Sequence, residues 1–130
     1  MRLQVAFEAV GLRAALPVLL YALPLDRTLQ ALTPRASSRT PRADALVAIE
    51  EVTDAMTRKL PLTRTGCLKR ALLRYALLRR QGYAAGFVIG VRPGGPDGFE
   101  AHAWVTLDGR PVMEHKPLDY RRTFVWPCEA

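Results

Sequence analysis

Cysteine and long apolar runs are both scarce in this chain of 130 residues. Its two cysteines, Cys67 and Cys128, are too few for a disulfide framework, so we expect a reducing compartment, the cytoplasm. The apolar run of residues 14–25 is interrupted by Pro17 and Pro24, and it is shorter than the roughly 20 residues that a membrane-spanning helix needs. The sequence therefore predicts no stable membrane insertion.

Motifs that hold phosphate or metal are missing as well. The glycine-rich segment 92–98 (RPGGPDG) lacks the lysine and the following helix of a Walker loop, so we expect no ATP site in this chain. Cys67, His102, His115 and Cys128 are residue types that bind zinc, but no C-x-x-C or H-x-x-x-H pair is present to start such a site. We expect neither a metal nor a cofactor.

Acidic residues are absent between Asp54 and Asp97, and the whole chain is basic, with a formal net charge of +7. The cations in this interval include Lys59, Arg64, Lys69, Arg70, Arg74, Arg79, Arg80 and Arg92. Such a run forms either a solvated face or a docking surface for an anionic partner. A nucleic acid is one such anionic partner, but Trp104 and Trp126 are not interleaved with the basic run as base-stacking aromatics would be.

The composition is globular, with 49% hydrophobic and 24% charged residues, and the length is that of one domain. Apolar residues at three- and four-residue steps predict a helix over residues 3–20, which Pro17 is expected to kink or split. A second helix starts at its N-cap Asp44, and a third covers residues 66–81 and ends at Gly82.

Toward the C-terminus the apolar pattern changes from helical to strand-like. Residues 84–91 (AAGFVIGV) are apolar and bounded by glycine, and residues 100–107 alternate between two faces. Asp108 and Gly109 turn the chain into a third strand over residues 110–114. The sequence therefore predicts an α+β fold, in which a helical N-terminal half packs on a small antiparallel sheet.

Cys67 lies in the first turn of the predicted third helix, where unpaired backbone N–H groups and the helix dipole favour a thiolate. Gly66 lets the backbone and a substrate approach closely, and Thr65 is the candidate N-cap. These features indicate a nucleophile, and the competing interpretation is a buried structural cysteine.

His102 shares its strand face with Trp104 and Thr106, which alternation marks as the more polar of the two faces. That placement suits an imidazole that must contact both a thiolate and a substrate, whereas a histidine considered alone is also compatible with a structural role. A cysteine at a helix start combined with a histidine on a later strand indicates nucleophilic catalysis, because a cysteine nucleophile needs such a base.

Three carboxylates after His102 are candidates for orienting its ring: Asp108, Glu114 and Asp119. Asp108 lies six residues along the strand, roughly 20 Å away at about 3.3 Å per residue, which is beyond hydrogen-bond reach. We therefore assign Asp108 to the turn, and the residues alone leave Glu114 and Asp119 open.

Two segments carry a family resemblance: GCLKRALLRYALLRRQGYAAGFVIGV (66–91) and FEAHAWVTLDGRPVME (99–114). They resemble the stand-alone leader peptidases of bacterial lasso-peptide biosynthesis, which are small transglutaminase-like, papain-related cysteine proteases. The similarity runs from about Ala45 to His115, and it depends most on GCL at a helix start together with AHAWV-x-x-DG.

The resemblance implies that Cys67 is the nucleophile, that His102 is the general base and then the acid, and that Glu114 orients the imidazole. This third position commonly holds aspartate in that family, so glutamate is a departure from its pattern. The implied reaction removes the leader of a ribosomally made precursor through an acyl-enzyme on Cys67, whose backbone N–H is the expected oxyanion donor.

The implied partners are the precursor peptide, a separate leader-recognition protein and an ATP-dependent lasso cyclase. The implied layout is an N-terminal helix and loop (1–42), a catalytic core (43–115) and a C-terminal tail (116–130). Three alternatives stay open: acyl transfer to an amine with the same cysteine and histidine, a basic nucleic-acid-binding module, and a non-catalytic scaffold.

The hairpin after His102 decides whether Glu114 can serve it. With a two-residue turn, Leu107 pairs with Arg110 and Glu114 points away from His102. With a three-residue loop and Gly109 in a bulge, Glu114 falls directly opposite His102. We predict the three-residue loop, because it gives the histidine an orienting acid.

Overall fold

The computed structural model describes residues 1–34, 40–58, 64–96, 98–115 and 118–127. Its helices are α1 (Arg2–Ala22), α2 (Leu25–Leu32), α3 (Ala43–Arg58) and α4 (Arg64–Arg80), and its strands are β1 (Ala85–Pro93), β2 (Phe99–Leu107), β3 (Arg110–Val112) and β4 (Arg121–Trp126). Helices make up the N-terminal half and strands the C-terminal half, so the predicted α+β class is confirmed.

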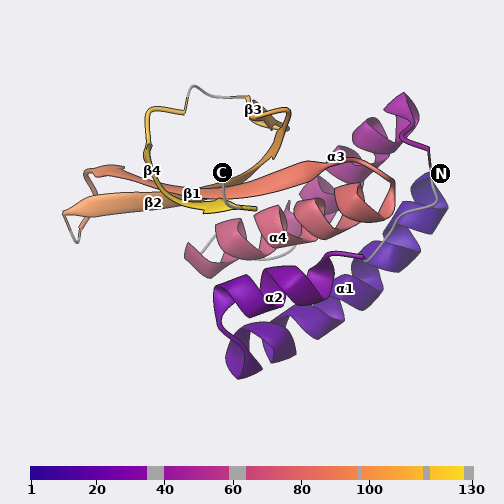
Figure 1. Cartoon of the computed structure of the whole chain (residues 1–130), viewed down its shortest axis with the longest axis horizontal. Coiled ribbons are helices and arrows are strands. Elements are labelled where there is room, and N and C mark those ends of the chain that lie inside the picture. The colour runs from indigo at the N-terminus through magenta and orange to yellow at the C-terminus, as the bar shows by residue number, and fades with distance from the viewer. Residues whose placement is uncertain (35–39, 59–63, 97, 116–117, 128–130) are drawn as a thin grey trace.

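The four strands form one antiparallel sheet in the order β3-β2-β1-β4. Helix α4 packs on β1 and β2, and it also contacts α1 and α3. Figure 1 shows α4 between the sheet on one side and α1 and α2 on the other. The molecule therefore has α4 at its centre, with one face of the sheet covered by helices.

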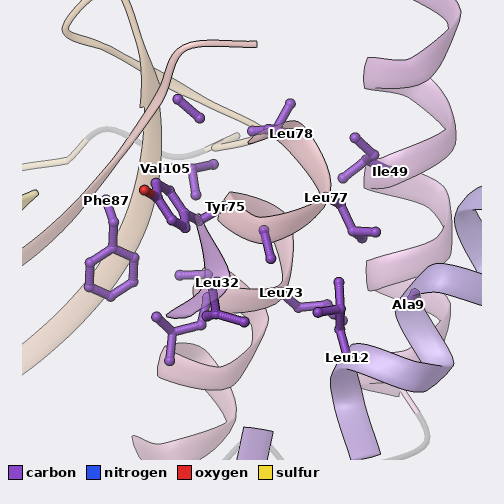
Figure 2. Close-up of a cluster of buried hydrophobic side chains, with 14 of the residues drawn as sticks. Ala9, Leu12, Leu32, Ile49, Leu73, Tyr75, Leu77, Leu78, Phe87 and Val105 are labelled. Carbon is purple, nitrogen blue, oxygen red and sulfur yellow. The ribbon is translucent and has the colours of Figure 1, made fainter. Parts of the chain in front are cut away.

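Helix α4 is buried on all sides along its middle. Residues 71–78 (ALLRYALL) are all buried, as expected for a helix that is apolar around most of its circumference. In Figure 2, Leu77 lies toward Ile49 of α3, and Tyr75 lies toward Phe87 of β1. This packing on both sides fixes where the first turn of α4 meets the sheet.

The end of α4 follows the prediction, but its start does not. Gly82 has φ 92°, and the N–H of Tyr83 donates to the carbonyl of Leu78, which is the hydrogen bond of a Schellman cap. The helix begins at Arg64, two residues before the predicted start. Thr65 therefore lies inside the helix and is not its N-cap.

Helix α1 continues as one helix through Pro17, so this proline does not split it, and a kink there stays a prediction. Proline removes one helical hydrogen bond, but packing of one face of α1 against α3 and α4 outweighs that loss. The buried residues of that face are Val5, Ala9, Leu12 and Leu16.

The other face of α1 is apolar as well. Its exposed large side chains include Leu3, Phe7, Val10, Val18 and Tyr21. By length and composition alone α1 could cross a membrane, which the apolar run of residues 14–25 did not indicate, although part of the helix is buried in the fold.

Two elements were not predicted, α2 and β4. Strand β4 pairs with β1 at the edge of the sheet, so the segment interpreted as a C-terminal tail contains part of the sheet. The indole N–H of Trp126 donates to the hydroxyl of Tyr75 at 2.9 Å, which links β4 to α4. The same hydroxyl contacts Thr33 Oγ1 at 2.6 Å, just after the end of α2.

Asp44 was predicted as the N-cap of the second helix, and this is wrong. Helix α3 begins at Ala43, so Asp44 is already in its first turn. Its carboxylate accepts a hydrogen bond from Arg42 at 3.2 Å, and a negative charge there still interacts favourably with the helix dipole.

Candidate active site

The site lies where the first turn of α4 meets β2. Cys67 is the fourth residue of α4, and its free thiol is half-buried. The distance from Cys67 Sγ to His102 Nδ1 is 2.9 Å, and to the carbonyl oxygen of Ala103 it is 3.8 Å. The fold therefore brings the predicted cysteine and histidine into direct contact.

The imidazole of His102 packs against two aromatic side chains. Its ring centroid is 5.4 Å from that of Tyr120 and 6.0 Å from that of Trp104. Gly90 lies opposite His102 on β1, and a Cβ there would come within 2.8 Å of the Trp104 ring and 2.7 Å of Tyr120 Cβ. The sheet face that alternation marks as polar is thus covered, and both Trp104 and Thr106 are buried in it.

Glu114 lies on the other side of the imidazole from the thiol. The distance from its Oε1 to His102 Nε2 is 3.1 Å, and both side chains are mostly buried, at 14% and 18% exposure. Both ring nitrogens of His102 are therefore occupied, one by Cys67 and one by Glu114. This leaves the imidazole little freedom to rotate.

The hairpin that delivers Glu114 is not the predicted one. Leu107 pairs with Arg110, so the loop is the two-residue turn Asp108–Gly109 and the predicted three-residue loop is wrong. Both turn residues have positive φ, 53° and 77°, which is the geometry of a type I′ turn and suits the Asp-Gly pair.

Met113 explains how Glu114 reaches His102 in spite of this register. Continuing the ladder past Val112 would place His115 opposite His102. Instead Met113 has φ 62°, a left-handed conformation that is uncommon for a residue with a side chain. Strand β3 therefore ends at Val112, and the chain changes direction at Met113, just before Glu114. The change in chain direction at Met113 replaces the predicted bulge.

Arg74 holds the backbone at Met113 from inside the protein. Its Nη1 donates to the carbonyl of Met113 at 3.3 Å, its Nε to Thr53 Oγ1 at 2.9 Å, and its Nη2 to Asp54 Oδ1 at 2.6 Å. Arg74 is only 4% exposed, so its assignment to a solvent-facing docking surface is wrong. Three acceptors compensate for the burial of the guanidinium.

The thiol and the imidazole change each other's proton affinity. Burial raises the pKa of Cys67, but the hydrogen bonds to His102 and to the backbone of Ala103, with the positive charges of His102 and Arg70, lower that pKa by more, so it falls below its ordinary value. The hydrogen bond with Cys67, followed by that with Glu114, raises the pKa of His102 to about 9. This arrangement favours a thiolate–imidazolium pair near neutral pH, which is the reactive form of a cysteine nucleophile.

Comparison with protein families agrees with this geometry. A family model described as the Transglutaminase-like superfamily matches residues 9–125. The chain belongs to this superfamily. Its members are generally enzymes, with cysteine protease or acyl-transfer activity. The match extends on both sides of residues 45–115, where the sequence resemblance lies, and it includes all of β4 except Trp126.

Neither the curated proteins nor the solved structures gave a match. The assignment to the transglutaminase-like superfamily therefore rests on the family model and on the arrangement of Cys67, His102 and Glu114.

The remaining candidates that the structure describes in this transglutaminase-like fold have no hydrogen bond with His102. Asp119 accepts a hydrogen bond from Arg92 at 2.6 Å and does not pair with His102, and Asp108 is in the turn as predicted. The imidazole of His115 pairs with Glu50 of α3. Cys128 lies outside the described residues, and the role of the Cys67 backbone N–H as oxyanion donor stays a prediction.

The sequence analysis missed Tyr120, Met113 and the buried role of Arg74. A signal for Tyr120 was present, because the RRTFVW segment that follows it is rich in the β-branched and aromatic residues typical of strands. Had β4 been predicted, the residues just before it would have been expected near the sheet. No pattern in the sequence indicates a left-handed methionine.

Replacing Glu114 with glutamine is expected to lower the rate of the Cys67-dependent reaction at least tenfold, or about 1.4 kcal/mol or more in the barrier. Glu114 helps to raise the pKa of His102, so removing its charge should lower that pKa from about 9. The loss of activity at high pH should then begin at a lower pH than in the wild type, as a profile of kcat/KM against pH would show.

The matched control is Asp119→Asn, which removes a nearby carboxylate that is bonded to Arg92 and not to His102. It should leave the high-pH limb of the kcat/KM profile, where activity is lost as pH rises, at the wild-type pH. A Glu114→Gln enzyme with wild-type rate and an unmoved limb would leave a cysteine–histidine pair without a third member.

Proposed function

We propose that this chain is a cysteine peptidase that removes the leader from a lasso-peptide precursor. The observation that best supports the peptidase chemistry is the contact chain from Cys67 Sγ through His102 to Glu114 in a transglutaminase-like fold. The specificity for a leader is supported by the sequence resemblance in residues 66–91 and 99–114. A cytoplasmic location, where the precursor is made, is part of the same proposal.

In the first half of the reaction, the thiolate of Cys67 attacks the carbonyl carbon at the leader–core junction. The tetrahedral oxyanion is stabilised by the backbone N–H of Cys67. The imidazolium of His102 gives its Nδ1 proton to the leaving nitrogen as the C–N bond breaks, while Glu114 keeps the hydrogen bond from Nε2–H. The core leaves with a free amine, and the leader stays on Cys67 as a thioester.

In the second half, the neutral imidazole takes a proton from water, and the resulting hydroxide attacks the thioester carbonyl. The C–S bond breaks, the leader leaves as a carboxylic acid that releases its proton to solvent, and the thiolate–imidazolium pair is restored. The free amine of the core is the group that a separate ATP-dependent cyclase would join to a side-chain carboxylate.

Mass spectrometry of the purified chain with a precursor peptide tests this proposal directly. We expect two products, a leader with a C-terminal carboxylate and a core with a free N-terminal amine. Adding a primary amine in excess separates hydrolysis from acyl transfer, because a transferase would release the leader as an amide. An intact precursor under all conditions, with and without the partner below, would rule the peptidase proposal out.

We also propose that a separate leader-recognition protein binds this chain and speeds up cleavage. Support comes from the apolar face of α1 and from a groove of about 510 Å³ between α1 and α3. Leu3 and Val10 of α1 line the groove with Met56 of α3, so a partner with a complementary apolar surface would fit it.

Val10→Glu is expected to reduce the stimulation by this partner at least about fivefold, because it places a charge in an apolar contact. The cleavage rate without the partner should not change. Val18→Glu is the matched control, since Val18 is similarly exposed on the same helix but lies outside the groove. Equal stimulation of both variants would exclude the groove, and binding of the chain to lipid vesicles that only Val10→Glu abolishes would assign it to a membrane surface.

The nucleic-acid alternative loses part of its basis in the structure. Arg74 is buried, and Arg79 donates to the carbonyl of Ala85 at 3.0 Å, so the arginines of α4 do not form one continuous exposed row. Lys59 lies outside the described residues. A binding module of that kind also has no use for a contact between Cys67 and His102.

A further inference from the structure

A pocket of about 670 Å³ opens beside the imidazole of His102. Glu114 lines the same pocket, so it adjoins the proposed catalytic residues. Its walls come from α3, α4, β1 and the segment that precedes β4. A peptide bound across Cys67 would place a neighbouring side chain at or in this pocket.

The charged side chains of the pocket are paired with one exception. Arg74 is paired with Asp54, and Arg92 is paired with Asp119 and also with Glu100. Glu114 is paired with His102.

The exception is Arg70, for which the structure gives no hydrogen bond or ion pair with any described residue. Its side chain is half-buried and lines the pocket. A guanidinium carries five N–H donors in a planar fork that matches a carboxylate, so an unpaired one in a substrate pocket is suited to bind an anion.

Arg70 is also close to the nucleophile. It follows Cys67 by three residues on α4, so the two side chains lie on neighbouring positions of one helix face, about 5–6 Å apart at their Cβ atoms. Its positive charge is among the contributions that lower the pKa of Cys67. A group bound by Arg70 would therefore lie near the reacting carbon.

We propose that Arg70 binds a carboxylate of the substrate, namely an aspartate or glutamate side chain within about two residues of the scissile bond. This inference rests on the proposed peptidase function and adds a substrate class to it. Arg70 determines specificity in this proposal, and the chemistry remains with Cys67 and His102.

The competing role for Arg70 is to stabilise the thiolate, without any contact to the substrate. Two alkylating reagents of nearly the same shape separate the roles, because iodoacetate is anionic and iodoacetamide is neutral. A change in thiolate fraction alters both alkylation rates equally, whereas attraction of a carboxylate alters only the rate with iodoacetate. The ratio of the two rates therefore reports binding of an anion near Cys67.

The ratio is measured on the full chain with Cys128 replaced by serine, so that Cys67 is the single reacting thiol. Arg70→Gln is expected to lower the iodoacetate-to-iodoacetamide ratio roughly three- to fivefold, with a smaller drop at high salt. Arg70→Lys should keep most of the ratio. Lys69→Gln is the matched control, since Lys69 is the adjacent cation on α4 but does not line the pocket, and it should change the ratio little.

The second measurement uses precursor peptides in which each acidic residue near the junction is replaced in turn by its amide. For wild type, one of these replacements should raise KM at least about threefold, and for Arg70→Gln the same replacement should have no effect. An alkylation ratio that is equal in wild type and Arg70→Gln would overturn the proposal, even if leader removal is intact. Failure to cleave any precursor, with the ratio still dependent on Arg70, would refute the peptidase function and leave the anion site in place.

Discussion

Replacing Cys67 with alanine is expected to lower the rate of leader removal by roughly 10⁴-fold or more. The change deletes the sulfur that lies 2.9 Å from His102 Nδ1, and no other described side chain occupies that position. Alanine is the best helix former, so α4 should be intact and the free energy of unfolding should change by no more than about 1 kcal/mol. Cleavage assays and urea unfolding of both proteins provide the measurement.

The same variant has a second readout that does not depend on the substrate. The hydrogen bond with Cys67 is the largest contribution that raises the pKa of His102 to about 9, so this pKa should fall in Cys67→Ala. Titration of the imidazole by NMR would follow the change. Cys128→Ala is the control and should cleave at the wild-type rate. A Cys67→Ala protein that still removes the leader, or a wild type that tolerates thiol alkylation, would end the cysteine-peptidase proposal.

Replacing Arg74 with methionine is expected to lower the free energy of unfolding by roughly 2–3 kcal/mol. The variant leaves the carbonyl of Met113, Thr53 Oγ1 and Asp54 without their donor. Asp54 is 42% exposed and water can replace its partner, so most of the cost should come from the two acceptors that the methionine covers. Chemical unfolding measured at one pH tests the estimate.

The activity of Arg74→Met separates a positioning role from a structural one. If Arg74 holds Met113 in its left-handed conformation, the variant should also move Glu114 away from His102. Its high-pH limb should then shift to lower pH, as in Glu114→Gln. Asp54→Asn removes the ion pair but keeps the bond to Met113, so it should cost less stability and leave the limb in place. A pH profile of Arg74→Met that is not shifted from that of the wild type would show that Arg74 only stabilises the fold.

The pairing of Cys67 with His102 could be predicted because both signals are local. A cysteine at a helix start and a histidine within an alternating strand are visible in windows of a few residues. Their contact then follows from packing one apolar helix on the sheet, which the composition of residues 71–78 already demands. The predicted α+β class was confirmed because helical and strand periodicity are also local patterns.

The contact of Glu114 was predicted, but the hairpin predicted to produce it was wrong. Sequence rules favour the two-residue Asp-Gly turn that is present. In a straight strand, that turn would have pointed Glu114 away from His102. The correction comes from Met113, whose backbone is held by Arg74 across 39 residues of sequence. Such a long-range constraint leaves no trace in local propensity.

The elements that were missed also depend on tertiary contacts. Helix α2 has eight residues, which is too short to be stable by propensity alone, and it is held by the burial of Leu29 and Leu32. Strand β4 follows a segment without a clear turn signal, and its pairing with β1 supplies its hydrogen bonds. Tertiary packing likewise overrides Pro17 in α1.

The left-handed Met113 has a consequence for recognising relatives of this protein. In an uninterrupted hairpin with a two-residue turn, the residue opposite the histidine is thirteen positions later, as His115 is to His102. With a two-residue turn, opposite residues are always separated by an odd number of positions. The acid of this chain is twelve positions after the histidine, and the left-handed backbone of Met113 is what allows this even interval. Among relatives with the same two-residue turn, an interval of twelve indicates a kink in the strand that carries the acid, and an interval of thirteen indicates a straight strand. The interval and the kink should therefore change together between homologous sequences.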